Sequence, residues 1–132
     1  MAVLIDTSVL VASERQQIRL EDLVEPAERY AVSVVTAAEL LHGVHRASGK
    51  RAQARSAYVE ALLATFSALP VDITVARAYA NASAALAAAG TPVDANDLWI
   101  GATAIAHGLM VLALDGDFDR IPGVTRLPIA RS

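Results

Sequence analysis

Two groups of acidic residues frame a stretch without formal charge in the last third of the sequence. Asp94 and Asp97 precede it, Asp115 and Asp117 follow it, and residues 98–114 contain no Asp, Glu, Lys or Arg. Carboxylates held a few ångströms apart repel one another unless a cation lies between them, and oxygen ligands suit Mg²⁺ or Mn²⁺. A metal site is therefore one chemistry open to these residues, provided that the fold brings the acids together.

The segments that must position these acids alternate between predicted strands and predicted helices. The apolar, β-branched runs predict strands at residues 2–5, 30–35, 69–71 (at most an edge strand), 109–114 and 124–127. Apolar periodicity and capping residues predict helices at 9–14, 36–46, 50–66, 73–89 and 97–107. Residues 14–29 are charged and include Pro26, which predicts a short surface helix with irregular flanks. This alternation predicts an α/β fold with a mainly parallel central sheet flanked by helices on both faces. The length of 132 residues predicts one domain, residues 1–132.

Four acids stand where such a sheet would gather functional groups. Asp6 follows the first predicted strand and Asp115 follows the fourth, while Glu39 and Asp97 lie in the first turns of predicted helices. Ligands and catalytic groups collect at the carboxyl ends of parallel strands, so all four side chains are expected in one crevice. A divalent cation there can activate water and neutralise charge on a phosphodiester, which predicts metal-dependent phosphodiester hydrolysis.

Each acid also has a purely structural explanation. Asp6 can cap the helix that follows it, although Thr7 or Ser8 can serve as that cap instead. Thr36 and Glu39 have the spacing of a capping box. The remaining acids fit other local roles: Asp94 or Asn96 as a helix cap, Asp94 with Asp97 as a weaker capping box, and Asp115-Gly116 as a turn. These explanations account for single positions but not for four acids at one end of one sheet.

Composition narrows the function classes. The chain has no cysteine, which excludes disulfides, thiolate metal sites and a cysteine nucleophile. Its start lacks the basic region of a secretory signal, and its longest apolar stretch is interrupted by His107 and Gly108, so we expect a cytoplasmic protein without a membrane span. The formal net charge of −3 gives no global attraction to nucleic acid, so RNA binding would need local charge.

Local positive charge is found in one run. Arg46, Lys50, Arg51 and Arg55 have no acid among them and can hold phosphates, or can form a solvated helix face. Trp99 can stack on a base or pack in the core. We assign no catalytic role to the three histidines, His42, His45 and His107.

Four motifs follow one another along the chain: LIDTSVL at residues 4–10, SVVTAAEL at 33–40, NDLWIGATA at 96–104, and DGDF at 115–118 followed by IPG at 121–123. Together they resemble the successive motifs of the PIN domain family, and especially of the VapC-like toxins of bacterial toxin–antitoxin modules. These motifs span essentially the whole chain and occur in the family's order.

The resemblance implies an Mg²⁺- or Mn²⁺-dependent endoribonuclease whose water attacks phosphorus and whose 3′-hydroxyl leaves. Asp6, Glu39, Asp97 and Asp115 would form its acidic quartet, with Asp6, Asp97 and Asp115 as metal ligands. It also implies an RNA substrate, a cognate antitoxin protein and a homodimer.

Two positions depart from the family pattern. Ser8 stands where many relatives have Asn, and its hydroxyl can still orient Asp6. Ala113 stands where many have Thr, which leaves open whether Asp115 or Asp117 supplies the last ligand, and Asp94 is close enough in sequence to reach the site.

Two other functions are alternatives to hydrolysis for a single α/β domain with acids at its strand ends. A phosphoacceptor signalling domain needs a lysine at a late strand end, and Lys50, the only lysine, lies in a helical region. A catalytically silent PIN-like interaction module would keep the acids only as caps, and its stability would not respond to divalent cations.

Overall fold

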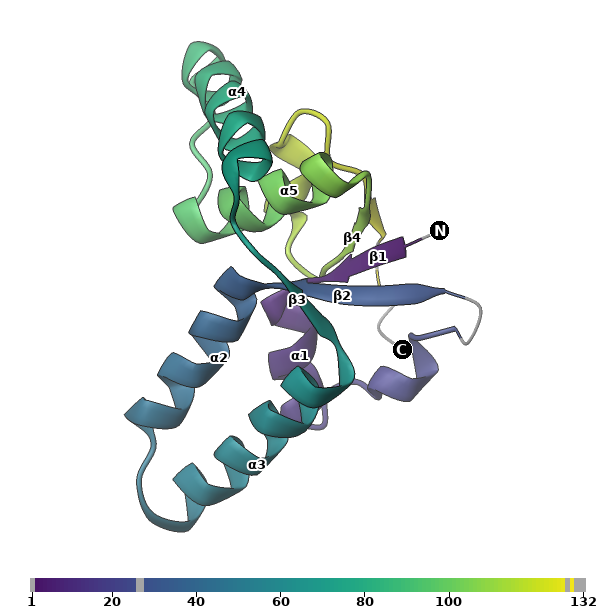
Figure 1. Ribbon diagram of the computed structural model, residues 1–132, viewed down its shortest axis with the longest axis vertical. Coiled ribbons are helices and arrows are strands. Elements are labelled where there is room, and N and C mark those ends of the chain that lie inside the picture. Colours follow the sequence, from purple (N-terminus) through teal and green to yellow (C-terminus); the bar gives the residue numbers. More distant parts are fainter. Residues whose placement is uncertain (1, 26–27, 128, 130–132) are drawn as a thin grey trace.

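The computed structural model describes residues 2–25, 28–127 and 129, so Pro26 and the two ends of the predicted domain 1–132 lie outside the described residues. Figure 1 shows one central sheet with helices above and below it. Its strands are β1 (Ala2–Ile5), β2 (Arg29–Ser33), β3 (Ser67–Leu69), β4 (Met110–Leu112) and β5 (Arg126–Leu127). They lie in the order β3-β2-β1-β4-β5, and every neighbouring pair is parallel. The predicted parallel α/β architecture is confirmed.

Helices cover both faces of the sheet. They are α1 (Thr7–Glu14), α2 (Val34–Arg46), α3 (Gly49–Thr65), α4 (Ile73–Ala89) and α5 (Ala95–His107), with 3₁₀ turns η1 (Leu20–Asp22) and η2 (Gly116–Arg120). Side chains of β1 alternate between the faces, as a strand requires. Leu4 packs with residues of α4, α5 and η2, whereas Val3 and Ile5 pack with residues of α1, α2 and α3. The sheet is therefore buried on both sides, consistent with its apolar strands.

Two predicted boundaries near the acids are wrong. Helix α1 begins at Thr7 rather than Val9, and its cap is Asp6, whose carboxylate accepts from the Ser8 amide. The predicted strand 30–35 ends at Ser33, because the Ser33 hydroxyl accepts from the Val35 amide and starts α2. A side-chain cap thus prevails over the β propensity of two valines.

The other differences concern short elements. Strand β3 lies at the sheet edge as predicted, but it ends before Pro70, and β4 is three residues long instead of six. In the described part of 14–29, after the end of α1, the 3₁₀ turn η1 stands in place of the predicted surface helix. No helix among the described residues is long and apolar enough to cross a membrane.

The strand order determines which strand ends are neighbours. The chain passes from β1 to β2 and β3 on one side, and α4 and α5 then return it to β4 on the other side of β1. The carboxyl ends of β1 and β4 consequently lie side by side, where the direction of strand addition reverses. Their contact continues beyond the strands, since the Asp6 amide donates to the Leu112 carbonyl at 2.9 Å.

Candidate active site

The four predicted acids line one cavity of about 470 Å³ at the carboxyl edge of the sheet. Asp6 follows β1, Asp115 follows β4, and Glu39 and Asp97 lie on α2 and α5. Figure 1 shows the first turns of α2 and α5 beside one another at the left of the sheet. The topology therefore brings together acids that are up to 109 residues apart in the sequence, from Asp6 to Asp115.

Asp6 is the most deeply placed of these acids, with 3% of its surface exposed. Its Oδ2 accepts from the Ser8 amide at 3.1 Å and from the Ser8 hydroxyl at 2.6 Å. Its Oδ1 is buried and has no hydrogen-bond partner among the described residues. Burial raises the pKa of this carboxyl, against the opposing effect of the Ser8 bonds. A buried carboxylate oxygen without a partner is costly, and a cation would satisfy it.

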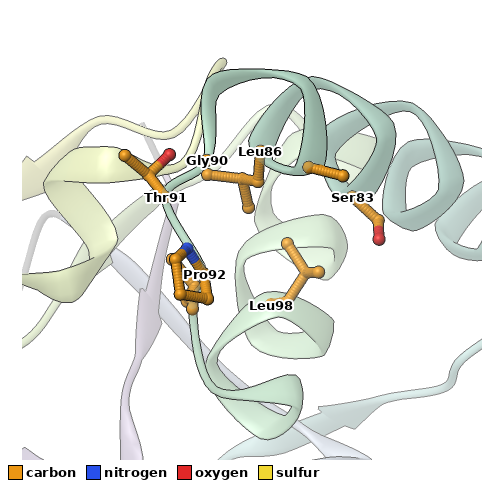
Figure 2. Close-up of a pocket in the computed structure, with 8 residues that line it drawn as sticks. Ser83, Leu86, Gly90, Thr91, Pro92 and Leu98 are labelled. Atoms are coloured by element: carbon orange, nitrogen blue, oxygen red, sulfur yellow. The ribbon is translucent and has the colours of Figure 1, made fainter.

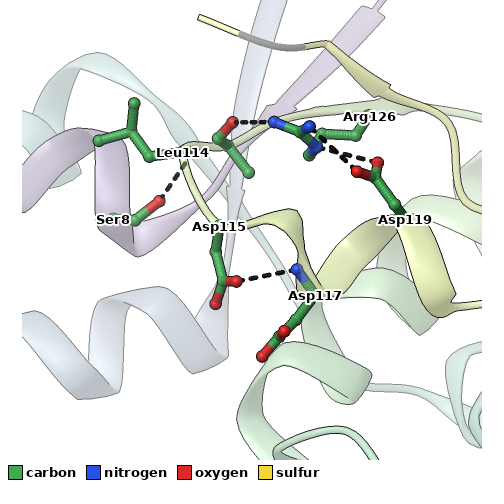
Figure 3. Close-up of polar contacts among 7 residues, drawn as sticks. Ser8, Leu114, Asp115, Asp117, Asp119 and Arg126 are labelled. Atoms are coloured by element: carbon green, nitrogen blue, oxygen red, sulfur yellow. Dashed lines mark hydrogen bonds and ion pairs between the residues drawn. The ribbon is translucent and has the colours of Figure 1, made fainter. Parts of the chain in front are cut away.

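Ser8 connects Asp6 to the segment that leads from β4 to Asp115. Besides donating to Asp6, its Oγ accepts from the Leu114 amide at 3.2 Å (Figure 3). The hydroxyl thus fixes the orientation of Asp6 relative to the segment that leads to Asp115.

Glu39 is held by neighbours from two other elements. Its Oε1 accepts from the Thr7 hydroxyl at 2.7 Å, and its Oε2 accepts from the Asn96 side-chain amide at 3.3 Å. The Thr7 hydroxyl also shares a hydrogen bond with the buried Thr36 hydroxyl. The capping-box explanation for Thr36 and Glu39 is wrong, because Ser33 caps α2 and Glu39 points toward α1 and α5.

The pKa of Asp97 is strongly raised in this site. Burial, a hydrogen bond with Asp115 and the negative charges of Asp6 and Asp115 raise the pKa of Asp97 to about 7. These causes require the acids to lie close together without a compensating positive charge. Asp94 is not part of the cavity lining; its carboxylate accepts from the Asn96 amide at 3.1 Å and caps α5.

Asp115 and Asp117 occupy different positions at the same turn. Asp115 lines the cavity and accepts from the Asp117 amide at 2.9 Å, as Figure 3 shows. Asp117 is not in that lining and forms an ion pair with Arg120. Even so, Asp97, Asp115 and Asp117 each offer one oxygen within 4.8 Å of the others, so both acids stay within reach of one cation.

The residues present fit a divalent cation. The ligand set consists of carboxylate oxygens alone, which suits Mg²⁺ and Mn²⁺ better than softer metals. The partnerless Asp6 Oδ1 and the raised pKa of Asp97 are both features that a bound cation would relieve.

Arg126 ties the η2 turn, which follows Asp115 and contains Asp117, to the edge of the sheet. Its guanidinium donates to both oxygens of Asp119, at 2.9 and 3.0 Å, and to the Ala113 carbonyl at 3.2 Å (Figure 3). This clamp holds the segment on either side of Asp115.

The predicted basic residues are only partly near the acids. Arg55 is held by Glu14, Nε to Oε2 at 3.2 Å, and by the Gly43 carbonyl, so it joins α3 to α1 and α2. Arg51 lines a depression of about 400 Å³, whereas Arg46 and Lys50 are exposed at the far ends of α2 and α3.

The basic residue that does line the acidic cavity is Arg15, which the sequence reasoning missed. Ser8, Val11, Ala12 and Arg15 line the cavity together and have the spacing of one helix face. That spacing would have revealed Arg15 if the start of α1 had been placed correctly.

The remaining candidates have structural surroundings. Trp99 stacks on Tyr79 with ring centroids 3.8 Å apart, so the packing interpretation fits it better than base stacking. His42, His45 and His107 are exposed and do not line the acidic cavity.

A second cavity, of about 360 Å³, lies between α4 and the segment that leads to α5. Figure 2 shows Leu86, Pro92 and Leu98 around it, and its lining contains no ionisable side chain. This second cavity therefore offers no side chain that could bind a metal or transfer a proton as an acid or base.

Comparisons with known proteins agree with this geometry. The family model for the PIN domain matches residues 3–124. Ribonuclease VapC4 of Mycobacterium tuberculosis is 38% identical over 126 residues, which cover 96% of this chain and 95% of the relative. The crystal structure of VapBC-5, a member of the VapBC family of toxin–antitoxin systems from the same organism, is 35% identical, covers 97% of this chain and 98% of that one, and has a TM-score of 0.80. VapBC2 from Rickettsia felis shares the fold with a TM-score of 0.88 at 20% identity, over 98% of this chain and 100% of that one.

Proposed function

The chain belongs to the PIN domain family, and from this premise we propose that it is a divalent-metal-dependent endoribonuclease that hydrolyses phosphodiester bonds in RNA. The observation that carries the proposal is the convergence of Asp6, Glu39, Asp97 and Asp115 on one cavity, in a chain 38% identical to a ribonuclease. We further propose that residues 1–132 form a single nuclease domain.

In this proposal Asp6, Asp97 and Asp115 hold Mg²⁺, for which Mn²⁺ can substitute. When bound, the cation supplies a Lewis acid that neutralises charge developing on the phosphodiester. Ser8 keeps Asp6 Oδ2 occupied, so that Oδ1 is the oxygen left for the cation. Asp117 can contribute a further oxygen beside Asp115.

Glu39 has a separate role in this scheme, because both of its carboxylate oxygens already accept hydrogen bonds, from Thr7 and from Asn96. Thr7 and Asn96 fix its carboxylate at the cavity wall, where it can orient a water for attack on phosphorus. As the water oxygen bonds to phosphorus and loses a proton to solvent, the bond from phosphorus to the 3′-oxygen breaks, and that oxygen takes up a proton from solvent. The products are a 5′-phosphate and a 3′-hydroxyl.

We also propose that the protein is the toxin of a toxin–antitoxin pair, acts in the cytoplasm as a homodimer and is restrained by a cognate antitoxin protein. Support comes from the VapBC-5 structure, which belongs to a family of toxin–antitoxin systems and is 35% identical to this chain.

The function is tested by incubating the protein with single-stranded RNA in Mg²⁺, in Mn²⁺ and in EDTA, and by determining the product ends. We expect cleavage with either cation, no cleavage in EDTA, and 5′-phosphate and 3′-hydroxyl ends. Cleavage that persists in EDTA would overturn the proposal. Product ends that carry a 2′,3′-cyclic phosphate would also overturn it, because a cyclic phosphate forms by attack of the 2′-hydroxyl rather than of water.

A further inference from the structure

Arg15 is the single basic residue in the described lining of the acidic cavity. It caps the C-terminal end of α1, the helix that Asp6 caps at the other end. Nine residues at a rise of about 1.5 Å separate their backbones by roughly 13 Å along the helix. The cavity therefore extends along one face of α1, with the carboxylates at one end and a guanidinium at the other.

The side chain of Arg15 is exposed and has no ion-pair partner among the described residues. Other arginines near the site are already engaged: Arg55 with Glu14, Arg120 with Asp117, and Arg126 with Asp119. A guanidinium that is free at the edge of a substrate cavity can donate two parallel hydrogen bonds to a phosphate.

The backbone after Arg15 turns toward the same cavity. Gln16 has φ 59°, and the amides of Gln16 and Gln17 donate to the Ser13 and Ala12 carbonyls, which ends α1. Glycine is the usual residue in this left-handed position, so Gln16 holds it at a cost. The turn brings Gln17 into the cavity lining beside Arg15.

Arg15 also lines the two neighbouring depressions. One, of about 170 Å³, includes Glu39 and Arg55, and the other, of about 400 Å³, includes Arg51 and Tyr58. The acidic cavity and both depressions thus have Arg15 in their lining, so Arg15 connects the acids with the surface that leads to Arg51. The larger depression is lined by three arginines, Arg15, Arg51 and Arg55, and by one acid, Glu14, which is paired with Arg55. A path of this kind, with net positive charge at its outer end, matches a flexible polyanion better than a small substrate.

We propose that Arg15 binds a backbone phosphate next to the scissile one, so that a single RNA strand runs from the acids along α1 toward Arg51. This inference rests on the proposed ribonuclease function and assigns to it a substrate-binding residue outside the acidic quartet. The role requires charge at the end of α1 and does not require Arg15 for folding.

The test measures binding of a short fluorescein-labelled single-stranded RNA of mixed sequence by anisotropy, over a range of salt concentrations. All proteins carry Asp97→Asn to prevent cleavage, and Arg15→Gln is compared with Arg15→Lys and with the control Arg77→Gln. Arg77 is exposed on α4 and does not line the acidic cavity.

We expect Arg15→Gln to weaken binding about tenfold and to reduce the salt slope by about 0.7, the value for one phosphate contact on a single strand. Arg15→Lys should keep the salt slope, and Arg77→Gln should keep both quantities. Thermal stability should be the same in all variants, which separates loss of charge from loss of fold. Arg51→Gln should reduce the slope further when combined with Arg15→Gln, since the two residues would hold different phosphates.

If the wild-type protein cleaves RNA but Arg15→Gln binds like Arg77→Gln, the inference about Arg15 is overturned and the proposed function stands. If Arg51→Gln has no effect on the slope, the path toward Arg51 is wrong. A protein that neither binds nor cleaves RNA would remove the proposed function and this inference with it.

Discussion

At the scale of single residues, Asp97 links the electrostatics of the site to the stability of the protein. Its pKa of about 7 exceeds the ordinary value of 3.8, so the folded state binds this proton more tightly than the unfolded state does. Ionisation of Asp97 therefore opposes folding, and its unfavourable contribution grows as the pH rises from about 4 to above 7.

Because ionised Asp97 opposes folding, the stability of the metal-free protein should depend on pH. A rise in the pKa of Asp97 from 3.8 to about 7 corresponds to roughly 4 kcal/mol in the free energy of unfolding. Solvent screening of this partly exposed carboxyl reduces the expected effect to about 1–2 kcal/mol. In EDTA, Asp97→Asn should equal the wild type near pH 4 and exceed it by about 1–2 kcal/mol at about pH 8, because the substitution removes the repulsion. Urea unfolding at a series of pH values measures this difference, and parallel curves for the two proteins would refute it.

Ser8 gives a second prediction at this scale. Its hydroxyl donates to Asp6 and accepts from the Leu114 amide, so Ser8→Ala leaves the Leu114 amide without this acceptor and Asp6 Oδ2 with the Ser8 amide as its remaining donor. We expect a loss of about 1–2 kcal/mol in the free energy of unfolding and a weaker affinity for Mn²⁺. Ser83→Ala on α4 is the matched control, expected within about 0.5 kcal/mol of wild type. Equal effects of the two substitutions would show that the Ser8 bonds contribute nothing.

The sequence predicted the contact between Ser8 and Asp6 but not the neighbours of Glu39. The first pair is two residues apart and follows from helix-cap geometry. Thr7 and Asn96 reach Glu39 from 32 and 57 residues away, so only the packing of α1 and α5 against α2 brings them there.

At the scale of elements, two glycines occupy different positions relative to their helices. Gly108 ends α5 with φ 66°, a left-handed conformation that an L side chain adopts with difficulty. Gly43 lies inside α2, where an added Cβ would meet Arg55 atoms at 3.8 Å, an ordinary contact distance.

We therefore expect opposite effects from the same substitution at these two positions. Gly108→Ala should destabilise the protein by about 1 kcal/mol, because strain enters at positive φ. Gly43→Ala should stabilise it by about 0.5–1 kcal/mol through helix propensity. Thermal unfolding measures both, and a stabilising Gly108→Ala would contradict the assigned helix end.

The errors at this scale have a common cause. Val34 and Val35 favour a strand by propensity, yet a hydroxyl cap at Ser33 starts α2 before them. Likewise, Leu109 to Leu114 is apolar throughout, but among the described residues pairing with β1 and β5 is confined to β4, Met110–Leu112. Long apolar runs show that a segment is buried, whereas the neighbouring strands decide how much of it is strand.

At the scale of the whole molecule, the function depends on strand order. The sequence predicted the parallel sheet and the helices on both faces, but local patterns cannot specify that β4 returns to lie beside β1. This placement is what makes Asp6 and Asp115 line one cavity. It also puts Arg15 at the far end of that cavity, although Arg15 belongs to none of the recognised motifs.

The effect of Mn²⁺ on the stability of the protein distinguishes a metal site from a catalytically silent interaction module. A preformed site should be stabilised by Mn²⁺ through mass action, by about 2.7 kcal/mol at a concentration one hundred times its Kd. The stabilisation should be larger at about pH 8 than at about pH 5, because the ligands must lose protons to bind. Differential scanning fluorimetry with and without Mn²⁺ measures it. An unchanged Tm at both pH values would favour the silent module.

In the proposed function, the four carboxylates at the carboxyl edge of the sheet act together on RNA. The most direct measurement compares kcat for RNA cleavage in Mg²⁺ between the wild type, Asp6→Asn, Asp97→Asn and the control Asp22→Asn. Asp22 lies on the exposed turn η1 and does not line the acidic cavity. We expect a loss of about a hundredfold or more in each quartet variant and no change in the control. Undiminished cleavage by Asp6→Asn or Asp97→Asn would contradict the account.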